Sequence, residues 1–173
     1  MNDKYKKEFE ENSEWLKFGF HALNSFKDYS KDDKIEEDFK LVNQKIKESI
    51  GESSLTNCLR LEKFNLSLSN AIVLRNNGVT SLLGSDKPNR ISYYLTESAE
   101  EYLESNDYYK DEYFEFYNTD IRIEDNGFIL FDNNDLQDEY LVIFTHEWKL
   151  NKINKLLLLY LVTILSQNNV IYL

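Results

Sequence analysis

Few residues of this chain are of the types that catalyse reactions or bind metals: two histidines, His21 and His146, and one cysteine, Cys58. His146 and Glu147 match the first half of a His-Glu-x-x-His zinc motif, but Leu150 stands where the second histidine is required. A cysteine becomes a nucleophile when a neighbouring group lowers its pKa, and no such neighbour is visible in the sequence. We therefore predict no metal site and no cofactor, and we expect Cys58 and His21 to be structural.

Two further segments resemble binding loops without matching them. The segment 78–85 has two glycines at the wrong spacing for a phosphate-binding loop, and no lysine follows the second glycine directly. The acid-rich segment 132–139 departs from the EF-hand calcium loop, because Leu136 and Gln137 occupy positions that need a ligand and a glycine. The sequence also has no nucleophile–base signature, so it predicts that the protein is not an enzyme. A carboxylate-based hydrolase without a recognisable motif is an alternative, because 31 acidic residues bring some carboxylates together.

The stretch 106–125 combines negative charge with aromatic rings. Seven of its twenty residues are Asp or Glu, six are Tyr or Phe, and its basic residues are Lys110 and Arg122. From Glu97 to Glu139 there are fifteen acidic residues against those two bases, a local net charge of −13, whereas the whole chain carries −11. Such a field repels nucleic acids and anionic membranes and attracts basic protein surfaces.

Two interpretations of this stretch are open. It can be a sheet edge, where acids prevent aggregation and alternate rings enter the core. It can also be a protein-binding surface, because tyrosine is enriched at interfaces and carboxylates on rigid elements imitate a path of phosphates. The density of tyrosines favours the second interpretation. The predicted partner-binding residues are Glu101, Glu104, Asp107, Tyr108, Tyr109, Asp111, Glu112, Tyr113, Glu115, Tyr117 and Asp120.

The sequence thus predicts an acidic inhibitor that occludes a basic protein partner by charge mimicry. The expected partner is a nuclease or another nucleic-acid-binding protein, because its basic surface would accept carboxylates in place of phosphates. Natural settings are a phage anti-defence protein of the anti-CRISPR kind and an immunity protein against a toxin. A third hypothesis, besides the hydrolase, is a structural or adaptor subunit that docks into an oligomer through an apolar surface.

Length and composition predict the number of domains and the cellular compartment. A chain of 173 residues with one proline and five glycines fits a single domain without long linkers. The first residues are charged and lack the apolar core of a signal peptide, and a single cysteine excludes an intrachain disulfide. The longest apolar run, 156–165, is about half the length that spans a bilayer. We predict a cytoplasmic protein with no membrane and no direct nucleic-acid contact.

Apolar spacing places most of the expected helices in the first half of the chain. It predicts helices over 5–26 and 35–50, which would form an N-terminal helical hairpin. Residues 52–90 fit a helix or a strand, and we favour a helix that ends near Gly78. A short strand over 91–95 and a short helix over 97–106 follow, the latter with capping-box spacing between Ser98 and Glu101.

Beyond residue 106 the apolar period changes to two. Strands are expected over 113–117, 121–124, 128–131 and 140–144, and Asn126-Gly127 favours a hairpin turn. They predict an antiparallel meander of three to four strands. A last helix over about 152–166 is apolar on nearly all sides, which is typical of a buried helix. The predicted fold class is α+β, one domain over 1–173, with a helical part at about 1–90, an acidic sheet part at about 91–150 and a core helix at about 151–167.

Overall fold

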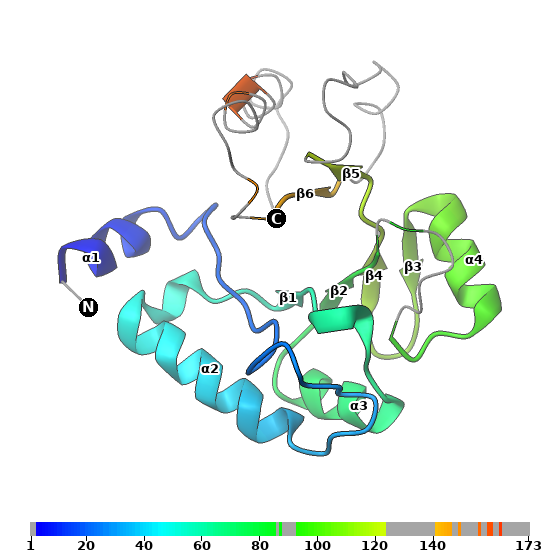
Figure 1. The fold of residues 1–173 in the computed structure, drawn as a ribbon. Helices are drawn as coiled ribbons and strands as arrows, with labels where there is room; N and C mark the ends of the chain where they lie inside the picture. Colours follow the sequence, from blue (N-terminus) through cyan, green and yellow to red (C-terminus); the bar gives the residue numbers. More distant parts are fainter. Residues whose placement is uncertain are drawn as a thin grey trace.

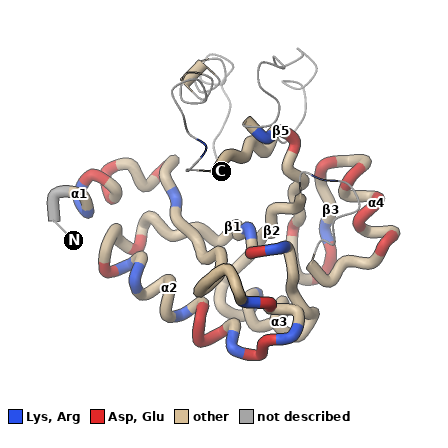
Figure 2. Tube along the Cα trace, viewed as in Figure 1, with Lys and Arg blue, Asp and Glu red and all other residues tan. Residues whose placement is uncertain are grey.

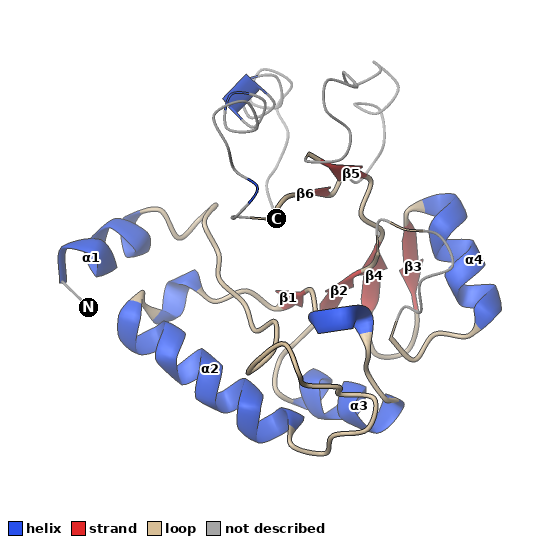
Figure 3. Cartoon of the chain, viewed as in Figure 1, coloured by secondary structure: helices blue, strands red, loops and turns tan. Residues whose placement is uncertain are grey.

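The structure is a computed structural model that describes residues 3–85, 87, 93–123, 141–146, 149, 156, 159, 160 and 163. Helices and strands are mixed along the described chain, with helices more frequent in the first half and strands in the second (Figures 1 and 3). The α-helices are α1 (Asp3–Glu11), α2 (Ile35–Ser49), α3 (Leu68–Asn76) and α4 (Glu97–Asn106), with short 3-10 helices η1 (Glu52–Ser54) and η2 (Glu62–Phe64). The strands are β1 (Cys58–Leu59), β2 (Ser81–Leu83), β3 (Tyr108–Lys110), β4 (Glu115–Tyr117), β5 (Ile121–Arg122) and β6 (Ile143–Phe144).

The main sheet has the strand order β1-β2-β4-β3. Its first three strands are parallel, with Leu82 of β2 opposite both Leu59 of β1 and Phe116 of β4. The hairpin of β3 and β4 is antiparallel and places Tyr109 opposite Phe116. Leu59, Leu82 and Phe116 are almost fully buried, so the middle of this sheet is the centre of the core. Helices α2 and α3 lie near the β1 side, and α4 packs beside β3 (Figure 1).

The α+β class is confirmed, but the predicted antiparallel meander is wrong. The main sheet is mixed and mostly parallel, and β5 pairs in parallel with β6 in a second sheet. The central strand β2 comes from a segment that the sequence left ambiguous, because a short apolar run fits a buried strand and a buried helix equally well. The expected strand over 128–131 and the turn at 126–127 lie outside the described residues.

The predicted N-terminal helical hairpin is also wrong. Helix α1 ends at Glu11, and residue 18 lies in an extended segment that pairs with the chain at Leu55. The Phe18 N–H donates to the Ser54 carbonyl at 2.7 Å, and the Thr56 N–H donates to the Phe18 carbonyl at 3.0 Å. Burial alternates from residue 16 to residue 23, so the aromatic side chains follow a period of two. Apolar residues four positions apart, such as Leu16 and Phe20, occur on one side of a helix and also on one face of an extended strand, so this spacing alone did not distinguish the two.

Glycine is needed in this extended segment. A Cβ atom at Gly19 would lie 2.6 Å from the Thr56 Cγ2 atom, which is closer than two carbon atoms can approach. Gly19 therefore lets the backbone come close to the segment before β1.

Three predicted helices are confirmed. Helix α2 covers nearly the expected range, and α3 ends just before Gly78, whose φ is +92°. Helix α4 has the expected bounds, although its cap is Thr96, whose Oγ1 accepts from the Ala99 N–H at 3.4 Å. The strand expected over 91–95 is absent where it is described, because residues 93 and 94 form a turn and Tyr93 has a φ of +62°.

The last predicted helix is described at four positions, 156, 159, 160 and 163, which are helical. Leu156, Leu159 and Tyr160 are 67%, 63% and 50% exposed, so the prediction of a buried helix is wrong for these residues. An apolar helix is stabilised when its side chains are buried, but its sequence does not show whether the same chain or another molecule buries them. None of the helices in the described ranges is long and apolar enough to cross a membrane.

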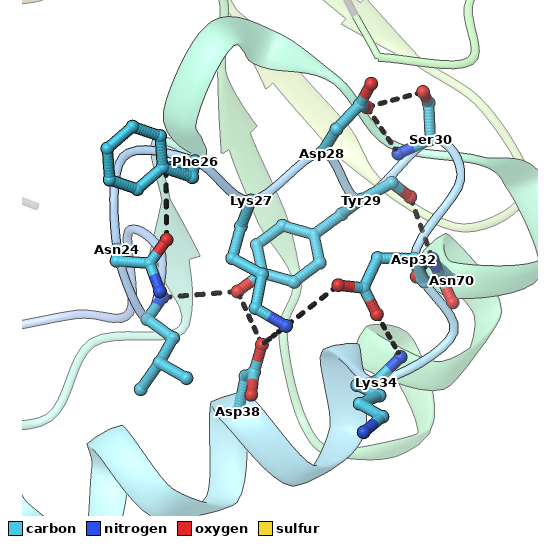
Figure 4. A network of polar contacts seen from close by, with 11 residues as sticks. Asn24, Phe26, Lys27, Asp28, Tyr29, Ser30, Asp32, Lys34, Asp38 and Asn70 are labelled. Carbon is cyan, nitrogen blue, oxygen red and sulfur yellow. Dashed lines mark hydrogen bonds and ion pairs between the residues drawn. The ribbon is translucent and has the colours of Figure 1, made fainter.

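A buried polar network fixes the loop before α2 (Figure 4). The Lys27 ammonium lies 2.8 Å from the Asp32 carboxylate and 3.0 Å from that of Asp38, which is buried in α2. The hydroxyl of Tyr29 donates to the same Asp38 oxygen at 3.0 Å. Asn70 of α3 donates to the backbone carbonyls of Tyr29 and Asp32, each at 2.7 Å. The network therefore joins the loop to both helices.

Candidate protein-binding surface

Helix α4 carries four glutamates and no basic residue, as the chain trace in Figure 2 shows. With about 100° between successive residues, they fall within a stripe about 100° wide along one side of the helix. Ala99 and Leu103 lie on the other side and are buried. The four residues of the stripe are Glu97, Glu100, Glu101 and Glu104.

The charges on α4 are poorly placed for the stability of the helix itself. The two residues in the first turn, Glu97 and Glu100, interact well with the positive end of the helix dipole. They also form like-charge i,i+4 pairs with Glu101 and Glu104, which are unfavourable. No basic residue stands in the last turn, and the acidic Asp107 forms the C-cap with a φ of +57°. Helix stability therefore does not explain this pattern of charge.

Aromatic rings hold α4 against the β3–β4 hairpin. The rings of Tyr102 and Tyr109 meet edge to face with centroids 6.0 Å apart, and Tyr102 is 54% exposed. Neighbouring residues of a strand point to opposite faces, so Tyr108 packs on Tyr117 at 5.3 Å on the other side of the hairpin. Because the contact between Tyr102 and Tyr109 holds the helix on the sheet, the glutamates project from a packed support. We call the surface formed by Glu97, Glu100, Glu101, Tyr102, Glu104, Asp107, Tyr109, Glu112 and Tyr113 the acidic face.

Asp111, which the sequence grouped with the binding residues, has contacts inside the protein. Its Oδ1 accepts from the N–H groups of Tyr113 and Phe114, each at 2.7 Å. Its Oδ2 accepts from the Tyr94 hydroxyl, also at 2.7 Å. Burial of Tyr94 and this carboxylate both raise the pKa of the Tyr94 hydroxyl far above its usual value. Asp111 therefore fixes the turn between β3 and β4.

Two more acidic residues predicted to bind a partner also have internal contacts. Glu115 lies 2.8 Å from the Lys110 ammonium and accepts from the Tyr117 hydroxyl at 3.1 Å. The hydrogen bond from Lys110 is the main cause of the lowered pKa of Glu115. Asp120 accepts from the backbone N–H of Val142 at 2.6 Å, which links the start of β5 to the segment before β6. These carboxylates stabilise the hairpin and the second sheet.

The structure thus divides the predicted binding residues into two groups. Tyr117 is buried, and Asp111, Glu115 and Asp120 have internal partners. Tyr108 faces the side of the hairpin opposite to α4, and the others lie on α4 and the hairpin at exposed or half-buried positions. The predicted list of binding residues omitted Glu97, Glu100 and Tyr102. For the two glutamates a usable signal was present, because Glu97 and Glu100 stand four residues before Glu101 and Glu104 in the same predicted helix.

The residues considered for catalysis have structural surroundings. The two ring nitrogens of His21 face the Arg60 carbonyl and the Glu62 carboxylate, the latter at 2.8 Å. Cys58 is partly buried, and burial raises the pKa of its thiol to about 11, so the thiol is protonated at neutral pH. Among the described residues, no group of three or more His, Cys, Asp or Glu side chains could hold a metal ion. No family model matches the chain, and neither the curated proteins nor the solved structures include a detectable relative.

Proposed function

We propose that the protein binds and occludes a basic, nucleic-acid-handling protein through the acidic face. The observation that carries this proposal is the stripe of four glutamates on α4, supported by packed tyrosine rings. Charge of this density lowers the stability of an isolated helix, so we infer that it serves an interaction with another molecule.

The density of these charges supports mimicry of a nucleic acid. From Glu97 to Glu104 the helix rises by about 10.5 Å, in steps of about 4.5, 1.5 and 4.5 Å between successive glutamates. The phosphates of one DNA strand are about 3.4 Å apart along the duplex axis. A groove that binds a strand through Lys and Arg side chains would therefore meet a similar number of negative charges over the same length of α4, at uneven intervals.

The tyrosines add the contacts that make such a complex specific. Tyrosine buries a large ring with few torsions to fix and offers one hydroxyl for hydrogen bonding. Tyr102, Tyr109 and Tyr113 belong to the acidic face, and at least part of each residue is accessible. Charge would then speed association with a basic partner, and the rings would hold the partner once bound.

A pull-down with the tagged protein tests this function. It uses lysate of the native host, or of cells that produce candidate nucleases, at low and at high salt. We expect one basic partner that is released as the salt concentration rises, because exposed charges are screened. Recovery of no basic protein at low salt would contradict the proposal.

A second candidate function, a subunit that docks into an oligomer, is favoured by one observation. Leu156, Leu159 and Tyr160 are helical, lie at i, i+3 and i+4 spacing, and are all at least half exposed. Residues with this spacing share one side of a helix, so a further chain could cover them. Light scattering after size exclusion would give the mass; a stable oligomer would support this function, and a monomer would oppose it.

A further inference from the structure

A cleft of about 470 Å³ lies between α2, the end of α3 and the segment before β1. This volume is within the range of about 300–1,000 Å³ that is usual for small-molecule sites. Lining residues 55–57 directly precede β1 at one edge of the main sheet, whereas the acidic face includes residues of β3 at the other edge. The lining residues are Lys17, Phe39, Asn43, Leu55, Thr56, Asn57, Asn77, Gly78 and Val79.

The cleft is lined by apolar side chains on one part of its surface and by polar side chains on another. Phe39 and Val79 are core residues, and Leu55 is half buried beside them. The polar part consists of three asparagine amides, one hydroxyl and the ammonium of Lys17. No acidic side chain is among these lining residues, which are all in the described part of the chain. The cleft is therefore suited to a ligand with a flat apolar ring, polar edges and a negative charge.

The amide oxygens of the cleft provide hydrogen-bond acceptors. The Oδ1 atom of Asn43 is buried and accepts no hydrogen bond, a state that costs about 1–3 kcal/mol. Rotation about the last torsion of this side chain meets a low barrier, so the oxygen can turn toward a donor in the cleft. The Nδ2 of Asn77 already donates to the carbonyl of Val73 at 2.9 Å and to Glu36 at 3.4 Å. Its amide therefore offers the cleft an oxygen and no hydrogen.

Lys17 provides a positive charge at the same site. Its ammonium donates to the Ser53 carbonyl at 2.8 Å, which fixes the side chain beside the cleft. An ammonium has three N–H donors, so two remain for an anionic group. Lysine is a common ligand of phosphate.

We propose that this cleft binds an adenine mononucleotide. The exocyclic amine of adenine donates hydrogen bonds, and asparagine amides pair with the adenine edge. The apolar part of the lining would contact the faces of the ring, and Lys17 would bind the phosphate. This proposal is independent of the function proposed for the acidic face, because the two surfaces share no residue.

Calorimetric titration with AMP, adenosine, GMP and inorganic phosphate tests the proposal on the whole chain. We expect a dissociation constant for AMP below about 1 mM and an affinity for adenosine at least about tenfold weaker. The Lys17→Met variant should bind AMP no better than adenosine, whereas Lys31→Met, at another exposed lysine, should bind AMP like the parent. No heat of binding with AMP at about 1 mM, or equal affinities for AMP and GMP, would overturn the proposal.

An asparagine variant separates loss of binding from loss of folding. Asn43→Leu removes the buried unpaired oxygen and fills part of the cleft, so we expect an unchanged or higher melting temperature and AMP binding weakened at least about tenfold. Gln44→Leu, one position along α2 and exposed, is the matched control and should bind AMP like the parent. Full AMP binding by Asn43→Leu would show that the ligand does not occupy the cleft and would overturn the proposal.

Discussion

The hydroxyl of Tyr94 donates to the Asp111 carboxylate at 2.7 Å, and this contact ties the turn of the β3–β4 hairpin to the chain before α4. The other oxygen of the same carboxylate accepts two backbone N–H groups of the turn. A residue that the sequence grouped with a binding surface is thus part of the support of that surface. Asp111 therefore stabilises the fold, and the proposed interaction with a partner does not depend on its carboxylate.

Removing this carboxylate should destabilise the protein. In Asp111→Ala the Tyr94 hydroxyl and two backbone N–H groups lose their acceptor, and we expect the free energy of unfolding to fall by about 1–3 kcal/mol. Urea denaturation followed by circular dichroism would measure the change. The neighbouring exposed residue gives the control, Glu112→Ala, for which we expect a change within about 0.5 kcal/mol. Equal stability of the two variants would show that the Asp111 contacts contribute nothing.

Neutralising the acidic face should have the opposite effect on stability. The variant Glu101→Gln, Glu104→Gln, Asp107→Asn, Glu112→Gln removes the like-charge pairs of α4, each of which costs about 0.2–0.5 kcal/mol, and keeps the two acids of the first turn. We expect a slightly higher melting temperature at low salt and a smaller increase at high salt, where charges are screened. Partner capture should be lost in the same variant.

A charge-matched variant makes that comparison specific. Glu8→Gln, Glu14→Gln, Asp33→Asn, Glu37→Gln removes the same number of exposed carboxylates at positions outside the acidic face. We expect this control to capture the partner like the parent protein. If both variants lose the partner equally, net charge and not the acidic face determines binding.

The helices that the sequence predicted correctly are those with strong local signals. Helix α4 follows Thr96 and begins with two acids in its first turn, and α3 ends just before Gly78. These signals act within a few residues, so they can be read without the rest of the chain. The segment 5–26 has no such signal at residue 11, where α1 ends, and its aromatic residues fit two periods.

The sheet could not be predicted in the same way. Strand β2 pairs with β1 and β4, which lie on either side of it in space and far from it in the sequence. Parallel pairs need crossover connections, and one sequence does not specify which strands they join. The structural role of Asp111 had a local signal that the sequence analysis did not use, because aspartate commonly accepts from backbone N–H groups two and three residues later in a turn.

A substitution in the middle of the sheet tests the observed strand order. Leu82 has no exposed area and lies between β1 and β4, so Leu82→Ala should leave a cavity and cost about 2–5 kcal/mol of unfolding free energy. Leu41 in α2 is 49% exposed, and Leu41→Ala should change the same quantity by about 1 kcal/mol or less. Chemical denaturation of both variants measures the difference. Similar costs for the two would contradict a central position of Leu82.

The network around Lys27 predicts how stability depends on pH. The hydrogen bond from Lys27 is the main cause of the lowered pKa of Asp32, whose ordinary value is 3.8. A carboxyl group whose pKa is lower in the folded state stabilises the protein fully above its unfolded pKa, and this contribution is lost as the pH falls through the folded value. We therefore expect the urea midpoint to fall as the pH decreases below 3.8.

Lys27→Met should reduce the part of this pH dependence that comes from Asp32. The variant also leaves the buried Asp38 with the Tyr29 hydroxyl but without a positive charge, so its midpoint should be lower than that of the parent at neutral pH. Lys31→Met is the control, because Lys31 is 83% exposed and lies 3.6 Å from Asp28. Urea midpoints measured from neutral pH down to about pH 2 would give both slopes. If the parent and Lys27→Met lost stability in parallel on acidification, the ion pair between Lys27 and Asp32 would not be the source of the pH dependence.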